Sequence, residues 1–280
     1  MNPLYISDLD GTLLRDNGTL SPFTRDALDE LLQENLSFTV ASARSVSSIK
    51  TIFAGLKLHL PVIEFNGAII SDLESGEHLF INSIDPPLVE DIYDVINARG
   101  CSPLVSTYTG SEDRLYYSSV TNDGISWYLK DRRTHNDKRL RFVDDIRTSF
   151  RDQVICLNVI GRIDVLSELE LEFRERYQDS LEIHCLQDQY SPGFFWLTAH
   201  HKKATKDHAI QVLQKLTGFP DCEVVVFGDN SNDISMFKMA HRSIAVSNAT
   251  EELKKYATEV IGSNNEDSVA RYIQNDWCRQ

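Results

Sequence analysis

Asp8 and Asp10 are the first residues of the sequence whose spacing could support catalysis. They stand two positions apart, after the apolar run at 4–6 and Ser7, and Gly11 follows them. If this run is a strand of a parallel sheet, both carboxylates lie at its carboxyl end, where open α/β sheets bind their ligands. A glycine at the next position allows the backbone to turn sharply. On its own, the pair is explained equally well by a turn in which an aspartate caps the next element.

A second acidic run favours a metal site. Asp229 and Asp233 follow the run at 224–227, whose valines are typical of a strand buried on both faces. Helix capping by Asp229 and Asn230 is the simpler explanation of this run alone. Acidic turns on two parallel strands would, however, gather three or four carboxylates in one crevice, where their repulsion favours binding of a cation. Oxygen ligands without a nearby set of His or Cys residues fit Mg²⁺.

Ser42 and Lys206 are the candidates for binding an anion beside these acids. Ser42 ends the run at 37–41, which we expect to form a strand, and it offers a hydroxyl and nearby backbone N–H groups. Lys206 lies at the start of a predicted helix at 205–216. Taken singly, Ser42 is more often a cap and Lys206 a solvated lysine. Together with the acids, they supply a nucleophile, a metal site, a hydroxyl and an ammonium around one phosphoryl group.

Alternating strand and helix patterns at both ends of the chain predict the elements that position these residues. Strands near 4–6, 37–41 and 61–65 alternate with helices, which predicts a parallel sheet with crossover helices, and the same alternation returns from 205 to 273. The middle of the chain predicts a hairpin that turns at Ser75-Gly76 and then mixed helices and strands. We therefore predict an α/β fold. Residues 1–82 and 190–280 form a parallel-sheet core with helices on both faces, and an inserted α+β domain at 83–189 interrupts it.

The acidic runs, Ser42 and Lys206 together resemble the four motifs of the haloacid dehalogenase (HAD) superfamily. The motifs follow in the order Asp8-Leu9-Asp10-Gly11-Thr12, Ser42, Lys206 and Gly228-Asp229-x-x-Asn232-Asp233. Within the superfamily, the sequence at 10–14, Asn66-Gly67-Ala68 and the long insertion are similar to the Cof-type sugar-phosphate phosphatases. The resemblance implies a Rossmann-like catalytic core, and the inserted domain resembles the large α/β cap of these enzymes by its size and position.

The resemblance also implies a role for each acid. Asp8 would attack phosphorus and form an aspartyl-phosphate, and Asp10 would protonate the leaving oxygen and then activate water. Mg²⁺ would be bound by the Asp8 carboxylate, the Asp10 backbone carbonyl and Asp229, with Asp233 acting directly or through water. These roles agree with the demands of phosphoryl transfer, which are chiefly in-line positioning and charge neutralisation.

The phosphate contacts that the resemblance implies are Ser42 and Lys206, with Asn232 steadying that network. The chain departs from the Cof pattern at two places. Ser42-Ala43-Arg44 stands where Thr-Gly-Arg is usual, and serine keeps the hydroxyl. Asp207 stands where a glycine commonly follows the motif lysine, and its carboxylate could pair with Lys206 and weaken the phosphate contact.

Arg44 and Asn66 are possible substrate contacts. Arg44 could reach an anion, or it could pair with one of the many acids of the chain. Asn66 could touch substrate, although an Asn-Gly turn explains it equally well. We expect the basic residues between 132 and 141 to form a solvated surface of the cap, because no interleaved aromatic residues mark a nucleic-acid site there.

The composition bears on partners and location. The chain has 42 acidic and 28 basic residues, a formal charge of −14, which disfavours nucleic-acid binding. It contains no apolar run long enough to cross a membrane and no visible secretory signal. Its five cysteines are scattered, without a Cys-x-x-Cys pair, which is typical of reduced thiols in a cytoplasmic protein.

We therefore predict a Mg²⁺-dependent phosphomonoester hydrolase that acts on a sugar phosphate or a similar small phosphorylated metabolite. Two alternatives stay open. A phosphomutase would use the same core but return the phosphoryl group to the sugar, and a non-catalytic protein that senses phosphate would keep the fold alone. The complete set of acids argues against the second, since a binding module does not need an acid/base beside the nucleophile. The sequence does not determine the exact substrate or the oligomeric state.

Overall fold

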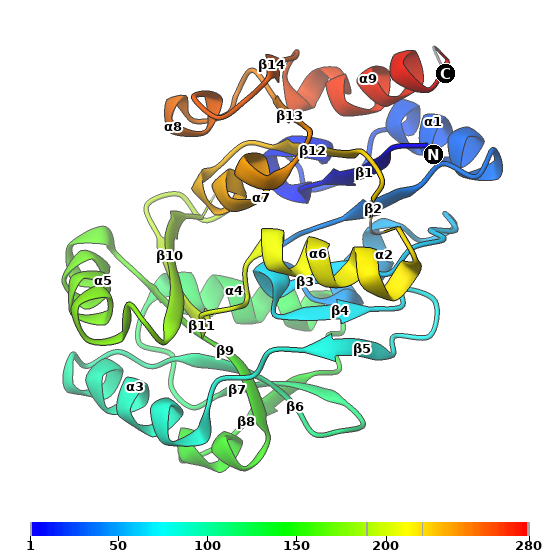
Figure 1. The fold of residues 1–280 in the computed structure, drawn as a ribbon. Coiled ribbons are helices and arrows are strands. Elements are labelled where there is room, and N and C mark those ends of the chain that lie inside the picture. The colour runs from blue at the N-terminus through cyan, green and yellow to red at the C-terminus, as the bar shows by residue number, and fades with distance from the viewer. Residues whose placement is uncertain (1, 189, 220, 279–280) are drawn as a thin grey trace. The chain divides into compact units, whose positions relative to one another are not determined.

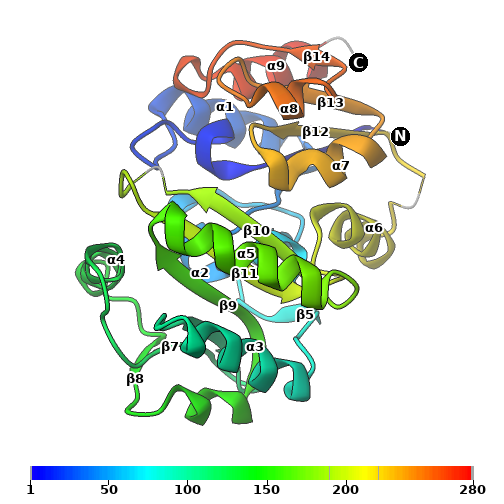
Figure 2. The same ribbon diagram turned by 90° about the vertical axis from the view of Figure 1, so that its left-hand side faces the viewer.

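The computed structural model describes residues 2–188, 190–219 and 221–278, which divide into two units (Figure 1, Figure 2). The first unit is formed by Met1–Ile81 and Ala204–Gln280, and the second by Asn82–Lys203. The second unit is thus an insertion within the first. The predicted boundary at Gln189 lies outside the described residues. The strand Phe195–His201, which we had assigned to the core, belongs to the second unit because it pairs with strands of that unit.

A five-stranded parallel sheet forms the centre of the first unit. Its strand order is β14–β13–β12–β1–β2. All residues of β1 and β12 are buried, and the two strands run in register, with Ser7 opposite Phe227. The residues that follow these strands therefore meet at one edge of the sheet. The strands are β1 (Leu4–Ser7), β2 (Phe38–Val40), β12 (Val224–Gly228), β13 (Arg242–Ala245) and β14 (Glu259–Val260).

Helices cover both faces of this sheet (Figure 1). The helices α1 and α9 pack together on one face, and α6 and α7 pack together on the other. The crossovers β1–α1–β2 and β12–α7–β13 run in opposite directions along the sheet, which places their helices on opposite faces. The α1 helix begins as predicted, since the Ser21 hydroxyl accepts a hydrogen bond from the Thr24 N–H at 2.9 Å. The helices are α1 (Pro22–Gln33), α2 (Val46–Ile52), α6 (Lys206–Thr217), α7 (Ile234–Met239), α8 (Glu251–Lys254) and α9 (Ser268–Trp277).

The third predicted strand belongs to a separate sheet, so this part of the prediction is wrong. β3 (Val62–Glu64) pairs antiparallel with β4 (Ile69–Ser71), which pairs antiparallel with β5 (His78–Ile81). A single parallel bridge, between Ala41 and Ile63, connects β3 to the residue after β2. The turn at Asn66-Gly67 after β3 returns the chain antiparallel to it, so β4 becomes its main partner.

The second unit is built on a six-stranded sheet of order β10–β11–β9–β6–β7–β8, in which only the β7–β8 pair is parallel. Its strands are β6 (Leu104–Tyr108), β7 (Asp113–Tyr117), β8 (Leu140–Phe142), β9 (Gln153–Gly161), β10 (Leu181–Gln187) and β11 (Phe195–His201). The helices α3 (Pro86–Ala98) and α5 (Ile163–Tyr177) share an apolar core with this sheet, and α4 (Asp123–Thr134) packs against β9. Within the described ranges, no helix combines the length and the apolar character needed to pass through a membrane.

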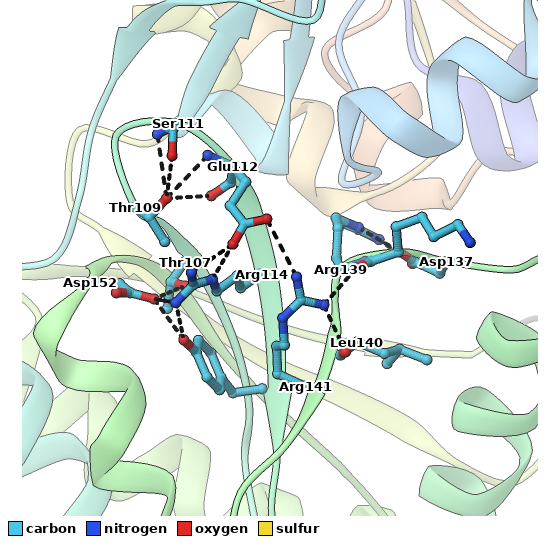
Figure 3. A network of polar contacts seen from close by, with 12 residues as sticks. Thr107, Thr109, Ser111, Glu112, Arg114, Asp137, Arg139, Leu140, Arg141 and Asp152 are labelled. Carbon is cyan, nitrogen blue, oxygen red and sulfur yellow. Dashed lines mark hydrogen bonds and ion pairs between the residues drawn. The ribbon is translucent and has the colours of Figure 1, made fainter.

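Arg114, Arg139 and Arg141, in and beside β8, are paired with acidic neighbours (Figure 3). Arg139 is buried and donates to both carboxylate oxygens of Asp137, at 3.0 and 2.7 Å. Arg114 and Arg141 both contact the carboxylate of Glu112. The expectation of a solvated basic surface is therefore wrong for Arg139. Its guanidinium is neutralised locally by an acid two positions away, a pairing that charge counting along the sequence does not reveal.

Candidate active site

A buried ion-pair network forms around Lys206 at the carboxyl ends of β1 and β12. Lys206 is the first residue of α6, and its side chain is fully buried. Its Nζ donates to Oδ1 of Asp8 at 2.7 Å and to Oδ1 of Asp233 at 2.6 Å. Asp8 directly follows β1, and Asp233 ends the short turn η4 (Ser231–Asp233) after β12. Among the described residues these two acids are the ion-pair partners of Lys206, so Asp207 does not compete for the ammonium.

Asp229 adds a third carboxylate to this network. Ligand atoms of Asp8, Asp229 and Asp233 all lie within 4.8 Å of one another. The Thr12 hydroxyl donates to Oδ1 of Asp229 at 3.1 Å. Gly11 has a φ of +75°, and a Cβ at this position would lie 2.5 Å from Oδ2 of Asp229. Glycine is therefore required here both by the backbone conformation and by the close approach of the acid.

Both carboxylate oxygens of Asp233 are engaged. Oδ1 accepts the hydrogen bond of Lys206, and Oδ2 accepts the backbone N–H groups of Asp229 at 2.9 Å and Asn230 at 3.2 Å. Together with the Asn230 side chain, Asp233 forms a capping box that closes the turn after β12. Asp233 thus fixes the position of both Asp229 and Lys206.

Burial raises the pKa of Asp8 and of Asp229. Burial raises the pKa of Asp8 to about 7, with a further contribution from Asp233, although Lys206 opposes the shift. Burial, with repulsion by Asp8 and Asp233, raises the pKa of Asp229 to about 8. Burial on its own would lower the pKa of Lys206, but Asp233 and Asp8 outweigh it and raise that pKa above its ordinary value. Lys206 therefore carries its positive charge at neutral pH.

The donor set fits a divalent cation. When the three acids are ionised, three negative charges face the single positive charge of Lys206. The pKa values of Asp8 and Asp229 are raised chiefly by burial, and repulsion between the carboxylates adds to the effect. A hard cation with oxygen ligands would offset the excess and keep both acids ionised. Asp8 and Asp229 are the better placed ligands, because Asp233 already bonds an ammonium and two backbone N–H groups.

Arg44 pairs with an acid, which is one of the two alternatives that the sequence leaves open. Its Nε donates to Oδ2 of Asp10 at 2.7 Å and its Nη2 to Oδ1 of Asp10 at 2.6 Å. A third guanidinium nitrogen, Nη1, donates to the Ser48 hydroxyl at 3.1 Å. The side chains of Arg44 and Asp10 keep 20% and 30% of their surface exposed, so this pair is open to solvent while the network around Lys206 is not.

Ser42 and Asn66 lie in adjoining turns, and hydrogen bonds connect them. Ser42 is buried, and its hydroxyl accepts the N–H of Arg44 at 3.2 Å. The Ser42 carbonyl accepts the N–H of Asn66 at 2.9 Å. Asn66 has a φ of +55° and accepts a hydrogen bond at Oδ1 from Nδ2 of Asn232, at 3.1 Å. The structure therefore brings Asn66 and Asn232 together, while Asn66 also has the left-handed backbone of the predicted Asn-Gly turn.

Two further polar residues lie near these turns, and the sequence did not single them out as site residues. Asn248 donates from Nδ2 to the Gly11 carbonyl at 2.8 Å and so holds the turn after β1. Glu64 is a fully buried acid at the end of β3. Glu64 could have been noticed in the sequence, because it is an acid in an otherwise apolar strand. The contact of Asn248 could not, because it depends on how the strands are arranged in the sheet.

Known proteins are similar to this chain over nearly its whole length. Residues 5–273 match the family model of the haloacid dehalogenase-like hydrolases. A protein of Haemophilus influenzae named "Putative phosphatase" is 27% identical over 277 residues, which cover 99% of each chain. A 5-amino-6-(5-phospho-D-ribitylamino)uracil phosphatase of Bacillus subtilis is 21% identical over 272 residues, 97% of this chain and 96% of that protein. The crystal structure of TM0651 from Thermotoga maritima is 27% identical and has a TM-score of 0.76, covering 98% of this chain and 97% of that one.

The chain belongs to the haloacid dehalogenase-like hydrolase family, because the family model spans almost all of it. The resemblance stated from the motifs is thereby confirmed. The predicted fold class is confirmed as well, since a solved haloacid dehalogenase-like hydrolase of Bacillus subtilis has a similar fold and this chain contains a parallel sheet and additional antiparallel sheets. The predicted enzyme class, a phosphatase of the haloacid dehalogenase type, is also confirmed.

Proposed function

We propose that this chain is a Mg²⁺-dependent phosphomonoester hydrolase that acts through an aspartyl-phosphate on Asp8. The observation that carries the proposal is the buried network in which Asp8 and Asp233 bond Lys206 and Asp229 adds a third carboxylate beside them. Phosphoryl transfer requires a positioned nucleophile and strong neutralisation of charge. A carboxylate fixed by an ammonium, beside a cation site, meets both requirements.

Asp8 is the nucleophile in this proposal. Lys206 bonds Oδ1 of Asp8 and leaves Oδ2 to form the bond to phosphorus, while the bond from phosphorus to the leaving oxygen breaks. Asp10 donates a proton to that oxygen and then accepts one from the water that hydrolyses the intermediate. Ser42, Lys206 and Asn232 bind the transferring phosphoryl oxygens.

Asp8 and Asp229 would hold Mg²⁺ together with the backbone carbonyl of Asp10. When bound, Mg²⁺ supplies neutralisation of the charge on the phosphoryl oxygens. Asp233 would act through water, since its oxygens are engaged by Lys206 and backbone N–H groups. The purely oxygen donor set supports Mg²⁺ over zinc, which prefers nitrogen and sulfur ligands.

The substrate that we propose is a sugar phosphate or a similar small phosphorylated metabolite of the cytoplasm. One relative, from Bacillus subtilis, is named for a phosphorylated ribityl compound, which supports a polyhydroxylated phosphate ester. The formal charge of −14 supports a small ligand rather than nucleic acid as the partner.

A turnover screen tests this function. The purified protein with Mg²⁺ is incubated with an aryl phosphate and a panel of phosphorylated metabolites, and inorganic phosphate is measured. We expect release of phosphate that is abolished by chelation of the metal and by Asp8→Asn, but not by Asp26→Asn, which alters an exposed acid of α1. Isomerised sugar phosphate without release of phosphate would indicate a phosphomutase. No reaction with any ester by the folded, Mg²⁺-loaded protein would favour the non-catalytic alternative.

A further inference from the structure

We propose that a buried cluster of Glu64, Ser71 and His78 positions Arg44 against Asp10 and thereby orients the acid/base residue. This inference rests on the proposed function, because it assigns the cluster an effect on that reaction. The three residues come from β3, β4 and β5 and lie outside the network around Lys206.

Glu64 is a fully buried carboxylate with polar partners on both oxygens. Its Oε2 accepts the backbone N–H of Val46, the first residue of α2, and its Oε1 accepts the Ser71 hydroxyl. Nδ1 of His78 lies 2.6 Å from the Ser71 hydroxyl oxygen and 3.5 Å from Oε1 of Glu64. The His78 side chain is only 2% exposed, so the acid and the imidazole share one enclosed site.

The contacts of Glu64 and its neighbour fix the backbone around Arg44. The N–H that Glu64 accepts belongs to Val46, two positions after Arg44. The N–H of Phe65, next to Glu64, donates to the Arg44 carbonyl at 3.2 Å. The segment that carries Arg44 is thus attached to the end of β3 at two points. The backbone position of Arg44 is consequently fixed. From this position its guanidinium makes two hydrogen bonds to Asp10.

A positioning role explains why a carboxylate occupies this buried place. Val62 and Ile63 show that β3 is otherwise apolar, and an apolar residue at 64 would avoid the cost of burying a charge. Such a residue could not accept the N–H of Val46. A nucleophilic role for Ser71 does not account for the cluster, because Ser71 is fully buried and its hydroxyl donates to Glu64.

The cluster therefore matters most for substrates that depend on proton donation. An alkyl phosphate has a poor leaving group that needs the proton of Asp10, whereas an aryl phosphate has a good leaving group that needs it much less. When one oxygen of Asp10 carries the proton, the other can still accept a hydrogen bond from Arg44, which keeps the carboxyl group in place. Loosening Arg44 would lose this alignment and would slow the alkyl ester more than the aryl ester. Simple loss of stability would instead lower both activities in the same proportion.

The test compares glycerol phosphate with 4-nitrophenyl phosphate in Glu64→Gln, Ser71→Ala and Arg44→Lys. Glutamine has nearly the same size as Glu64. Its amide N–H₂ group, however, would face either the Val46 N–H or the Ser71 hydroxyl, which both donate to Glu64. We expect kcat/KM for the alkyl ester to fall on the order of tenfold further than for the aryl ester in Glu64→Gln and Arg44→Lys, and less far in Ser71→Ala. The control is Glu77→Gln, an exposed acid of the same hairpin, for which we expect no change in the ratio.

Since Glu64→Gln and Arg44→Lys act on one contact, the double variant should lose little more than either single variant. A folded Glu64→Gln protein that keeps the wild-type ratio of the two activities overturns the inference. Should that variant not fold, an unchanged ratio in folded Ser71→Ala overturns it.

A second measurement separates this inference from the proposed function. Absence of Asp8-dependent turnover in the wild type would overturn the proposed function. In that case the position of Arg44 can still be measured by NMR, from the signal of its Nε–H group. This signal is assigned as the one that disappears in Arg44→Lys. We expect exchange of this hydrogen with solvent to be about tenfold faster in Glu64→Gln and unchanged in Glu77→Gln, because Glu64→Gln weakens the hydrogen bond to Asp10. Equal exchange in both variants and the wild type overturns the positioning role.

Discussion

Lys206 is as deeply buried as the valines of β12, although it carries a charge. It is accommodated because Asp8 and Asp233 both accept its hydrogen bonds. Removing the ammonium would leave these carboxylates buried without a positive partner. Lys206 therefore contributes both to stability and to the charge balance that a phosphoryl group would meet.

We expect Lys206→Ala to lower kcat/KM by about a hundredfold or more, because an electrostatic contact to the phosphoryl group is lost. We also expect a loss of stability of about 3–5 kcal/mol, the usual cost of breaking a buried ion pair. Turnover of an aryl phosphate and urea unfolding measure the two effects. Lys215→Ala, an exposed lysine on the same helix, is the control. Near wild-type turnover in Lys206→Ala would remove this residue from the site.

The raised pKa values of Asp8 and Asp229 predict how stability depends on pH. In the metal-free protein Asp8 and Asp229 keep their protons up to about pH 7 and 8, whereas in the unfolded chain they lose them near pH 3.8, the ordinary pKa of an aspartate. Between these limits the folded state binds more protons, so the free energy of unfolding falls as pH rises. Mg²⁺ should therefore raise the melting temperature more at about pH 8.5 than at about pH 5.5, since fewer protons compete with it.

Asp229→Asn tests this account at one residue. It removes one of the two carboxyl groups whose pKa is raised, so the stability of the metal-free protein should depend less on pH. It also removes a metal ligand, so the shift in melting temperature caused by Mg²⁺ should disappear. Melting curves with Mg²⁺ and with chelator, taken across this pH range, measure both effects. A Mg²⁺ shift that persists unchanged in Asp229→Asn would contradict the ligand assignment.

At the scale of elements, the sequence predicted those parts of the fold that depend on local pattern. β1 and β12 are short apolar runs followed by acids, and α1 begins with Ser21 and Pro22, so their positions follow from burial and capping. The pairing of β3 did not follow, because an apolar run has the same appearance in a parallel sheet and in a hairpin. The boundary of the insertion was placed too early for the same reason, since β11 pairs with a strand far away in sequence.

The sequence predicted that four residues of the candidate site lie together, but it did not predict their contacts. The order of the motifs predicted that Asp8, Asp229, Asp233 and Lys206 lie together, and they do so in the structure. The concern about Asp207 arose because it is the neighbour of Lys206 in sequence. Successive residues of a helix point in different directions, so the lysine meets acids from other elements instead. The buried partners of Glu64 were not visible, because they depend on the side chains of three strands.

Gly67, in the turn after β3, makes a close backbone contact with the residue before α6. It has a φ of +103°, and a Cβ would lie 2.3 Å from the carbonyl oxygen of Thr205, the residue before Lys206. Gly67→Ala should therefore displace the start of α6 and lower both turnover and stability. Gly55→Ala is a matched control, because Gly55 has a φ of +88° with open space around it and should lose only about 1 kcal/mol from backbone strain. Melting curves and turnover of both variants decide, and equal effects would contradict the coupling.

At the scale of the whole molecule, the formal charge of −14 opposes the approach of an anionic substrate. Within the site, Lys206 and a bound divalent cation would together offset the three carboxylates, so a phosphoryl group would meet a locally neutral pocket. Salt screens long-range repulsion between exposed charges but acts weakly on buried groups.

We therefore expect kcat/KM for a phosphate ester to rise about two- to threefold from low salt to about 0.15 M salt, at constant saturating Mg²⁺. The value of kcat should hardly change, because the contacts within the buried site are not screened. Initial rates in sodium chloride measure both constants. A fall in kcat/KM over this range would show that attraction, rather than repulsion, governs the encounter with substrate.

The central claim is that the phosphoryl group passes through Asp8, and trapping the intermediate tests it most directly. The protein is mixed with substrate and Mg²⁺, quenched during turnover and treated with borohydride, which reduces an acyl phosphate to an alcohol. Mass spectrometry of the peptide that contains Asp8 and Asp10 then locates the change. We predict conversion of Asp8 alone, dependent on both substrate and Mg²⁺. Active enzyme that releases phosphate while Asp8 stays unmodified, or that carries the modification at another residue, would contradict the account.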